Sequence, residues 1–249
     1  MPDAGFSGPS EIGLRFLSEV KLKQIWYACY GSNLRAERFN CYIVGGKPAG
    51  SVGMESAGSI DKTPPTSTTT FKTDWQLYFA KEFVGWGGKG VAFLKPGETD
   101  ACSTTAQDSN KPGALCRLYK ISFEQFVDVV LQENGGRSSH SQLRASVKNE
   151  VVQAMQSIGT KGTTVLRQGV LDGSWYRRMV RLGTHEDLPV LTFTSDEQLS
   201  FVPPGEAYLR TIALGLLESW HGKLSKAELI DYLARSARWP QEDVVGLIS

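Results

Sequence analysis

The feature that most constrains this chain is a stretch near its start, where an apolar run breaks at a glycine and leads into a helix. Residues 25–30 are apolar and aromatic, as in a buried strand. Gly31 allows the backbone to turn sharply, and Ser32 and Asn33 are good N-cap residues for a helix over 34–39. Such a turn leaves backbone N–H groups aimed at one point, where a carboxylate or developing oxyanion can bind. The same spacing also fits an ordinary strand-to-helix turn.

Length and charge exclude several classes of protein. A chain of 249 residues, of which 41% are hydrophobic, can bury a sizeable core. Without a repeat or clear linker, we expect residues 1–20 to be a partly mobile leader and residues 21–249 to form a single domain. The 27 basic and 26 acidic residues nearly cancel, so no electrostatic surface favours a nucleic-acid partner. No apolar run approaches the roughly 20 residues of a membrane span.

Cysteine and histidine usage gives no support for a metal or cofactor. The four cysteines are scattered, and with no secretory signal we expect reduced thiols and a cytoplasmic protein. Cys29 is either a small buried apolar residue or a nucleophile. The three histidines lie far apart, and the HExxH, GxSxG and P-loop patterns are missing. We therefore expect no metal and no cofactor.

A literal GxGxxG pattern occurs at residues 85–90. Dinucleotide binding needs that pattern to follow a strand and open a helix. Here it leads directly into the strand-like residues 91–94, which excludes a dinucleotide site. Two interpretations remain open: a glycine-rich turn that approaches a ligand with Trp86 as a wall, or a plain hairpin connection.

Periodicity predicts several further elements. We expect long loops over 47–70 and 95–112, strands over 75–80, 113–121, 175–182 and 188–194, and helices over 123–133, within 137–170, after Pro203-Pro204, and after Ser225. Ser122 and Gln125 predict a capping box. Glu133 lies in the last turn of its helix, at the edge of the apolar stripe, and Asp128 is expected to face solvent. The helix dipole raises a carboxylate pKa there, so Glu133 is either a proton shuttle or a solvated surface residue.

Four separated segments, in order, resemble the γ-glutamylcyclotransferase-like family, in its bacterial type. They span roughly residues 25–220 and are Tyr30-Gly31-Ser32-Asn33, the glycine-rich segment 86–93, the strand and helix from Leu118 to Glu133, and Pro203-Pro204 followed by Tyr208, Ile212, Gly215 and Glu218. The family often carries Glu-Gly where this chain has Glu133-Asn134, and the two long loops exceed a compact member. These departures concern the substrate more than the fold.

The resemblance implies an α+β fold, a mixed β-barrel flanked by helices. It also implies release of 5-oxoproline and a free amine from a small γ-glutamyl amide or peptide, by attack of the substrate's own α-amine. No protein nucleophile or metal is needed, because holding the substrate folded raises the effective concentration of the amine. The protein would act as a monomer or homodimer. The resemblance makes Glu133 the catalytic acid and base, and the substrate-binding residues Tyr30, Gly31, Ser32, Asn33, Leu34, Trp86, Gly88 and Tyr208.

Two alternatives belong to other classes. The same fold can serve as a non-catalytic binding module for an amino-acid-like ligand. The second alternative is an amide-forming or hydrolytic enzyme that uses an external nucleophile. Product mass separates the latter, because cyclisation consumes no water.

Overall fold

The chain folds into an α+β structure, described by a computed structural model for residues 23–48, 55–97, 113–137, 139–166, 171 and 173–248. Its strands are β1 (Gln24–Cys29), β2 (Ser67–Lys72), β3 (Gln76–Phe83), β4 (Lys89–Lys95), β5 (Leu115–Ser122), β6 (Gly162–Val165), β7 (Arg178–His185) and β8 (Leu188–Thr194). Its helices are α2 (Ala36–Val44), α3 (Phe123–Glu133), α4 (Ser141–Ser157), α5 (Glu206–Ser219), α6 (Lys226–Ala237) and α7 (Gln241–Leu247), with single 3₁₀ turns η1 (Ser32–Leu34) and η2 (Val84–Trp86). The predicted α+β class is confirmed.

The strands form an open mixed sheet and a separate ribbon. The six-stranded sheet has the order β2-β5-β1-β8-β7-β6, and β3 pairs with β4 alone. In the centre of the sheet, β1 runs antiparallel to β5 and parallel to β8. The expected barrel is therefore corrected: among the described residues the strands do not close into one hydrogen-bonded cylinder, because β2 and β6 are free edges.

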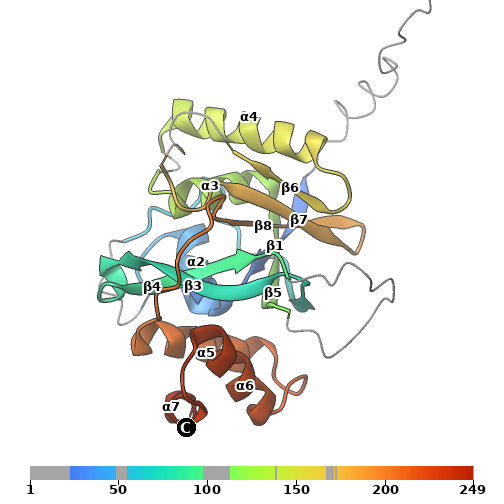
Figure 1. Ribbon diagram of the computed structural model, residues 1–249. Coiled ribbons are helices and arrows are strands. Elements are labelled where there is room, and N and C mark those ends of the chain that lie inside the picture. The colour runs from blue at the N-terminus through green and yellow to red at the C-terminus, as the bar shows by residue number, and fades with distance from the viewer. Residues whose placement is uncertain are drawn as a thin grey trace, which may run out of the picture.

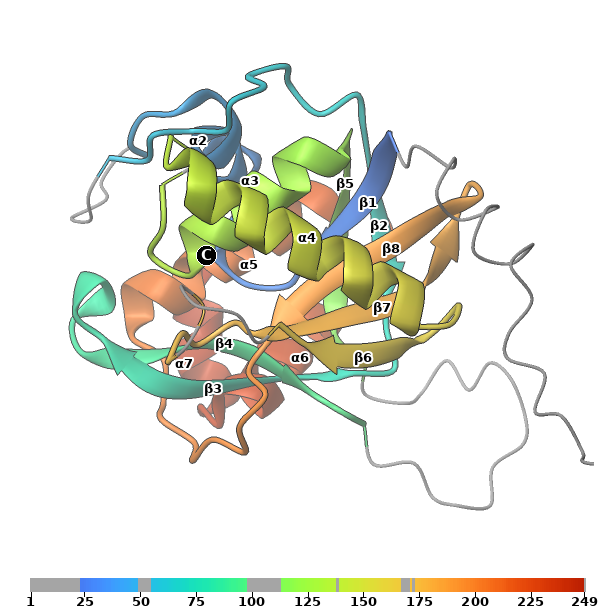
Figure 2. The ribbon, with the colours of Figure 1, turned by 90° about the horizontal axis from the view of Figure 1, so that it is seen from above.

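Alternation along β1 divides its side chains between two cores. Ile25, Tyr27 and Cys29 face a core shared with α2, α3 and α4. The intervening residues Trp26 and Ala28 face a core that includes the β3–β4 ribbon and the C-terminal helices. Figures 1 and 2 show this layering: α3 and α4 cover one side of the six-stranded sheet, and α5, α6 and α7 lie beyond the ribbon on the other. The central strand is thus buried on both faces, which fixes where its C-terminal end emerges.

Local sequence signals locate several element ends. Ser122 accepts a hydrogen bond from the Gln125 N–H, and the Gln125 side chain accepts one from the Ser122 N–H, so the predicted capping box starts α3. The helix ends at Glu133, and Gly135 follows with φ of +81°, a conformation that favours glycine. A second capping box, formed by Ser225 with Glu228, starts α6, the helix expected after Ser225.

Other expectations need correction. Part of the predicted loop 47–70 is the edge strand β2, and β6 and α7 were not predicted. Asp128 does not face solvent: it is fully buried, accepts hydrogen bonds from Arg144 and from the Ile60 N–H, and forms an ion pair with Arg144. Helix α4 packs against the face of α3 that carries Asp128, a face that the sequence pattern of α3 alone predicts to be exposed.

Three expectations fall on residues outside the described ranges: the leader at 1–20, residues 49–54 of the first loop and residues 98–112 of the second. Within the described residues, no helix is both long and apolar enough to cross a membrane.

Candidate functional site

The turn after β1 is shaped by space around Gly31. This residue has φ of −108°, so its backbone is not in the left-handed region. A Cβ atom at Gly31 would lie 3.2 Å from Ala92 Cβ and 3.2 Å from the Tyr208 hydroxyl. Glycine is therefore favoured because β4 and α5 approach the backbone closely, and not because of the direction of the turn.

The C-terminal side of the turn is fixed from three directions. Tyr119 donates its hydroxyl hydrogen to the Asn33 carbonyl at 3.1 Å, and Arg117 donates to the Leu34 carbonyl at 3.3 Å. Gly215 packs against Leu34 so closely that an added Cβ would lie 2.6 Å from Leu34 Cβ. These contacts come from β5 and α5, so the loop is held by elements of both cores.

Asn33 and Glu133 meet at the centre of the site. The Asn33 side-chain amide donates to Glu133 Oε1 at 2.8 Å. The other polar atom of that side chain, Asn33 Oδ1, is buried and has no hydrogen-bond partner among the described residues. A buried unpaired acceptor is uncommon and costly in a folded protein. A ligand that donates a hydrogen bond at this point would satisfy it.

The surroundings of Glu133 suit proton transfer. Burial raises the pKa of this carboxyl, while hydrogen bonds from Tyr42 and Asn33 and the nearby Arg38 charge lower it in part. The net effect is a raised pKa, with burial as the main cause. A raised pKa brings a carboxyl closer to the range in which it can both take and return a proton.

A small cavity of about 50 Å³ lies between the turn, the end of α3 and the start of α5. Its walls are formed by Tyr27, Cys29, Tyr30, Gly31, Ser32, Asn33, Ala92, Glu133, Tyr176, Phe193 and Tyr208. The N–H groups of Gly31 and Asn33 have no acceptor among the described residues. The cavity thus combines free donors, one free acceptor and one carboxyl.

Tyr208 is a further wall residue of the cavity. Its hydroxyl accepts a hydrogen bond from the Ala92 N–H at 3.1 Å. Burial raises the pKa of Tyr208 to about 12, although backbone hydrogen bonds from Ala92 and Ser32 lower it in part. The phenol therefore stays protonated at neutral pH and can donate to an oxygen in the cavity.

The predicted site residues fall into two groups. Tyr30, Gly31, Ser32, Asn33, Glu133 and Tyr208 all line the cavity. Leu34, Trp86 and Gly88 lie outside that lining. The Leu34 N–H donates to the Gly31 carbonyl at 3.0 Å, so it is not available to a ligand.

Trp86 has a different position from the one predicted for a wall of the cavity. Its ring centroid lies 4.8 Å from that of Tyr208, and the Arg38 guanidinium lies 4.8 Å from the Trp86 centroid. Trp86 thus packs against the Tyr208 ring and the Arg38 guanidinium without lining the cavity. Gly88, with φ of +67°, belongs to the turn between β3 and β4. Of the two interpretations of the glycine-rich segment, the hairpin connection therefore fits the position of Gly88.

Sequence reasoning missed four residues around the site. Arg38 and Tyr42 lie four residues apart on α2, a spacing that places both on one helix face toward Glu133. Tyr176 donates its hydroxyl hydrogen to the Ala92 carbonyl at 3.1 Å. Asn134 holds that segment, since its side chain accepts from the Tyr176 N–H at 3.1 Å. The i,i+4 pair was a usable signal, whereas Tyr176 follows no local pattern.

Cys29 lines the cavity but lacks the character of a nucleophile. Burial raises the pKa of its thiol well above the usual value, so it is protonated at neutral pH. The described residues contain no group of three or more His, Cys, Asp or Glu side chains arranged to hold a metal ion.

Comparison with known proteins gives one relative in sequence and several in structure. No protein-family profile matches the chain. It is 34% identical over 233 residues to histone deacetylase 5 of Arabidopsis thaliana, a match that covers 87% of this chain and 31% of that protein. The chain thus spans less than a third of this relative.

Solved structures that resemble the fold are distant. One is a γ-glutamyl cyclotransferase, 13% identical, with a TM-score of 0.41 and coverage of 91% of this chain and 99% of that one. Another is YkqA of Bacillus subtilis, 15% identical, with a TM-score of 0.40 and coverage of 92% and 59%. The likeness concerns the general fold alone.

Proposed function

We propose that this chain is a γ-glutamyl cyclotransferase, which releases 5-oxoproline and a free amine from a small γ-glutamyl amide or peptide. The proposal rests on the site itself and on the four ordered segments that resemble the family. Its substrate is a small molecule. We place the enzyme in the cytoplasm, where its thiols would stay reduced, in keeping with the free Cys29, Cys41 and Cys116.

The observation that carries the proposal is the unpaired Asn33 Oδ1 beside Glu133. A substrate α-ammonium group is a donor with three hydrogens and a positive charge. Placed here, it satisfies the buried acceptor and pairs with the carboxylate. The N–H groups of Gly31 and Asn33 and the hydroxyl of Tyr208 supply donors for the substrate's oxygens.

The reaction then needs one proton carrier. Glu133 takes a proton from the α-ammonium, and the freed amine attacks the γ-carbonyl carbon, forming a C–N bond. The carbonyl oxygen becomes an oxyanion that the donors of the turn stabilise. Glu133 returns the proton to the leaving nitrogen, and the original amide bond breaks. The attacking nitrogen, which still carries two hydrogens, loses one of them as the lactam forms. The released amine takes up that proton and leaves as an ammonium ion together with 5-oxoproline. No water is consumed and Glu133 ends in its starting state.

The small volume of the cavity bears on the substrate. Ligand pockets for whole small molecules are usually several hundred Å³, whereas this one is about 50 Å³. It fits the charged head of an amino acid, so the leaving amine would lie outside the cavity. We therefore expect tolerance toward the leaving group, to be measured with γ-glutamyl amino acids, dipeptides and amines.

The deciding experiment is Glu133→Gln, with release of 5-oxoproline as the readout. We expect a loss of about 10²–10⁴-fold in kcat, as for removal of a general acid–base group, with substrate binding largely kept. Glu242→Gln, a change at an exposed glutamate of α7, is the matched control and should act like the parent. If Glu133→Gln turns over like the parent, the catalytic assignment fails.

Two further outcomes separate the alternatives. Binding of a γ-glutamyl compound by the parent without any 5-oxoproline would support a non-catalytic binding module. A product containing added water would indicate hydrolysis. Deacetylation, the activity in the name of the plant relative, belongs to a protein of which this chain spans 31%, and an acetyl-lysine peptide assayed in parallel should release no acetate.

A further inference from the structure

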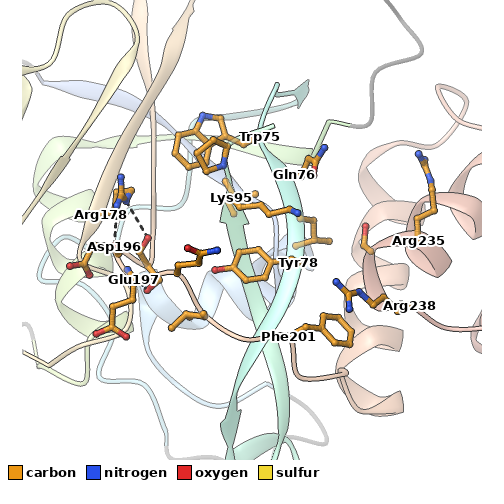
Figure 3. Close-up of a pocket in the computed structure, with 17 residues that line it drawn as sticks. Trp75, Gln76, Tyr78, Lys95, Arg178, Asp196, Glu197, Phe201, Arg235 and Arg238 are labelled. Carbon is orange, nitrogen blue, oxygen red and sulfur yellow. Dashed lines mark hydrogen bonds between the residues drawn. The ribbon is translucent and has the colours of Figure 1, made fainter. Parts of the chain in front are cut away.

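A second and larger cavity, of about 700 Å³, lies beside the β3–β4 ribbon. It is bounded by β3, the end of β4, the segment 195–201 that follows β8, and the C-terminal end of α6 (Figure 3). It shares no lining residue with the small cavity around Glu133. Between the two, Thr194 hydrogen-bonds both the N–H and the carbonyl of Leu94, at 2.8 and 2.9 Å. The volume lies within the range of pockets that bind whole small molecules.

The walls of this cavity carry excess positive charge. Four cations line it, Lys95, Arg178, Arg235 and Arg238, against two carboxylates, Asp196 and Glu197. Both carboxylates are already neutralised by cations that do not line the cavity. Asp196 pairs with Arg177 at 2.9 Å and Glu197 pairs with Lys81 at 3.3 Å.

Two of the lining cations have no acidic partner among the residues that the structure describes. Within the described part of the chain, neither Lys95 nor Arg238 lies within 4.0 Å of a carboxylate, whereas Arg235 pairs with Asp231 at 3.0 Å. Arg178 instead donates to the carbonyls of Ser195 and Asp196 and so stiffens the wall. Lys95 and Arg238 are therefore free to pair with an anion.

Aromatic rings lie among these charges. Trp75, Tyr78 and Phe201 line the cavity and are partly buried. In Figure 3, Tyr78 lies near the middle, with Arg235 and Arg238 on one side and Arg178, Asp196 and Glu197 on the other. Ring faces of this kind can stack on a planar group.

The backbone at Arg238 has an uncommon conformation for a charged residue. Arg238 is the C-cap of α6 with φ of +55°, a left-handed conformation that normally selects glycine. Its guanidinium lies 4.2 Å from the Phe201 ring centroid, at the edge of the cavity. A charged side chain of the cavity wall thus stands at a position where glycine would relax the backbone.

We propose that this cavity binds a small anionic ligand of the nucleotide class, in which a phosphate group pairs with Lys95 and Arg238 and an aromatic base stacks on Trp75 and Tyr78. Lysine and arginine are the usual partners of phosphate. The aromatic surface distinguishes such a ligand from free phosphate. The site would serve binding beyond the cyclotransferase chemistry, because its residues are separate from those of that site.

The test is calorimetric titration of the full chain with ATP, AMP, adenosine and inorganic phosphate. We expect saturable binding of ATP or AMP with a Kd of about 1 mM or below. Adenosine and inorganic phosphate should each bind at least about tenfold more weakly, because each lacks one of the two contacts. Binding should also weaken as salt is raised.

Variants locate the binding. Lys95→Gln and Arg238→Gly should each lower nucleotide affinity about tenfold, the usual effect of losing one charged hydrogen bond. Arg238→Gly also relieves the left-handed strain, so its Tm should not fall and lost binding cannot be ascribed to misfolding. Lys226→Gln and Arg210→Gln, at exposed positions outside both cavities, are the matched controls.

Three results would overturn the proposal. The first is no saturable binding of either nucleotide. The second is nucleotide binding that Lys95→Gln and Arg238→Gly leave unchanged. The third is equal binding of inorganic phosphate and ATP, since inorganic phosphate does not use the stacking surface.

Discussion

The side-chain amide of Asn33 donates a 2.8 Å hydrogen bond to Glu133, although the two residues lie 100 positions apart in the chain. One follows the central strand β1 and the other ends helix α3, which packs against that strand. The bond therefore connects the turn to the carboxyl that faces it. A ligand that enters the small cavity meets both groups together.

Asn33→Ala should shift the pH dependence of cyclisation. The Asn33 amide favours the charged form of Glu133 and lowers its pKa. Without it the pKa rises further, so the basic form appears only at higher pH and the acidic limb of the kcat/KM profile moves upward. We also expect about a 10- to 100-fold loss of kcat/KM at pH 7. Asn40→Ala, at an exposed position of α2, should change neither, and an unmoved limb in Asn33→Ala would contradict the assignment.

Glu133→Gln should stabilise the fold at neutral pH. Burial raises the folded-state pKa of Glu133 above the unfolded value of about 4.3, so the native state binds the proton more tightly. The resulting stability is fully present below the unfolded pKa and is lost as pH rises through the folded pKa. Glutamine has no such titration, so the Tm of the variant should rise relative to the parent as pH increases from about 4. Thermal melts of both proteins from pH 4 to 8 measure this difference in Tm. A difference in Tm that does not change with pH would contradict the raised pKa of Glu133.

Gly215→Ala should destabilise the protein through the turn it supports. An added Cβ would lie 2.6 Å from both the Leu34 carbonyl carbon and Leu34 Cβ, so backbone must move. We expect a loss of about 1–3 kcal/mol, as for overpacking of a core. Gly246→Ala on α7 meets no atom within 4 Å and should instead be neutral or stabilising by up to about 1 kcal/mol. Urea unfolding of both variants compares them, and equal effects would contradict the packing argument.

The parts of the structure that follow from local chemistry were predictable. The capping box at Ser122 and the helix end before Gly135 each depend on residues within a few positions of one another. The helix start expected at Ser32 and Asn33 was wrong, because Ser32–Leu34 form a 3₁₀ turn without a side-chain cap and α2 begins after Arg35. The sequence predicts a loop where the Thr-rich strand β2 lies, because a polar edge strand shows no apolar alternation. Its β-branched threonines nevertheless favour a strand.

The neighbourhood of Glu133 could not be predicted in the same way. Its pattern on α3 fitted equally a surface residue and a proton shuttle, and only the pairing of distant elements places Asn33 and Tyr42 against it. Asp128 shows the same limit. The pattern of its own helix gives no sign of Arg144, which arrives from α4 and allows a charge to be buried.

Asp128→Asn should therefore cost far more stability than a change at the other acidic partner of Arg144. Asp128 is fully buried. Its carboxylate accepts hydrogen bonds from Arg144 Nε at 2.5 Å and from the Ile60 N–H at 2.9 Å. Asparagine leaves the guanidinium without that charge, a loss of about 3–5 kcal/mol for a buried pair. Glu124 also pairs with Arg144, at 2.7 Å, but its side chain is 41% exposed, so Glu124→Gln should cost about 1 kcal/mol or less. Urea unfolding at pH 7 compares the two, and similar losses would show that burial does not govern the strength of this cluster.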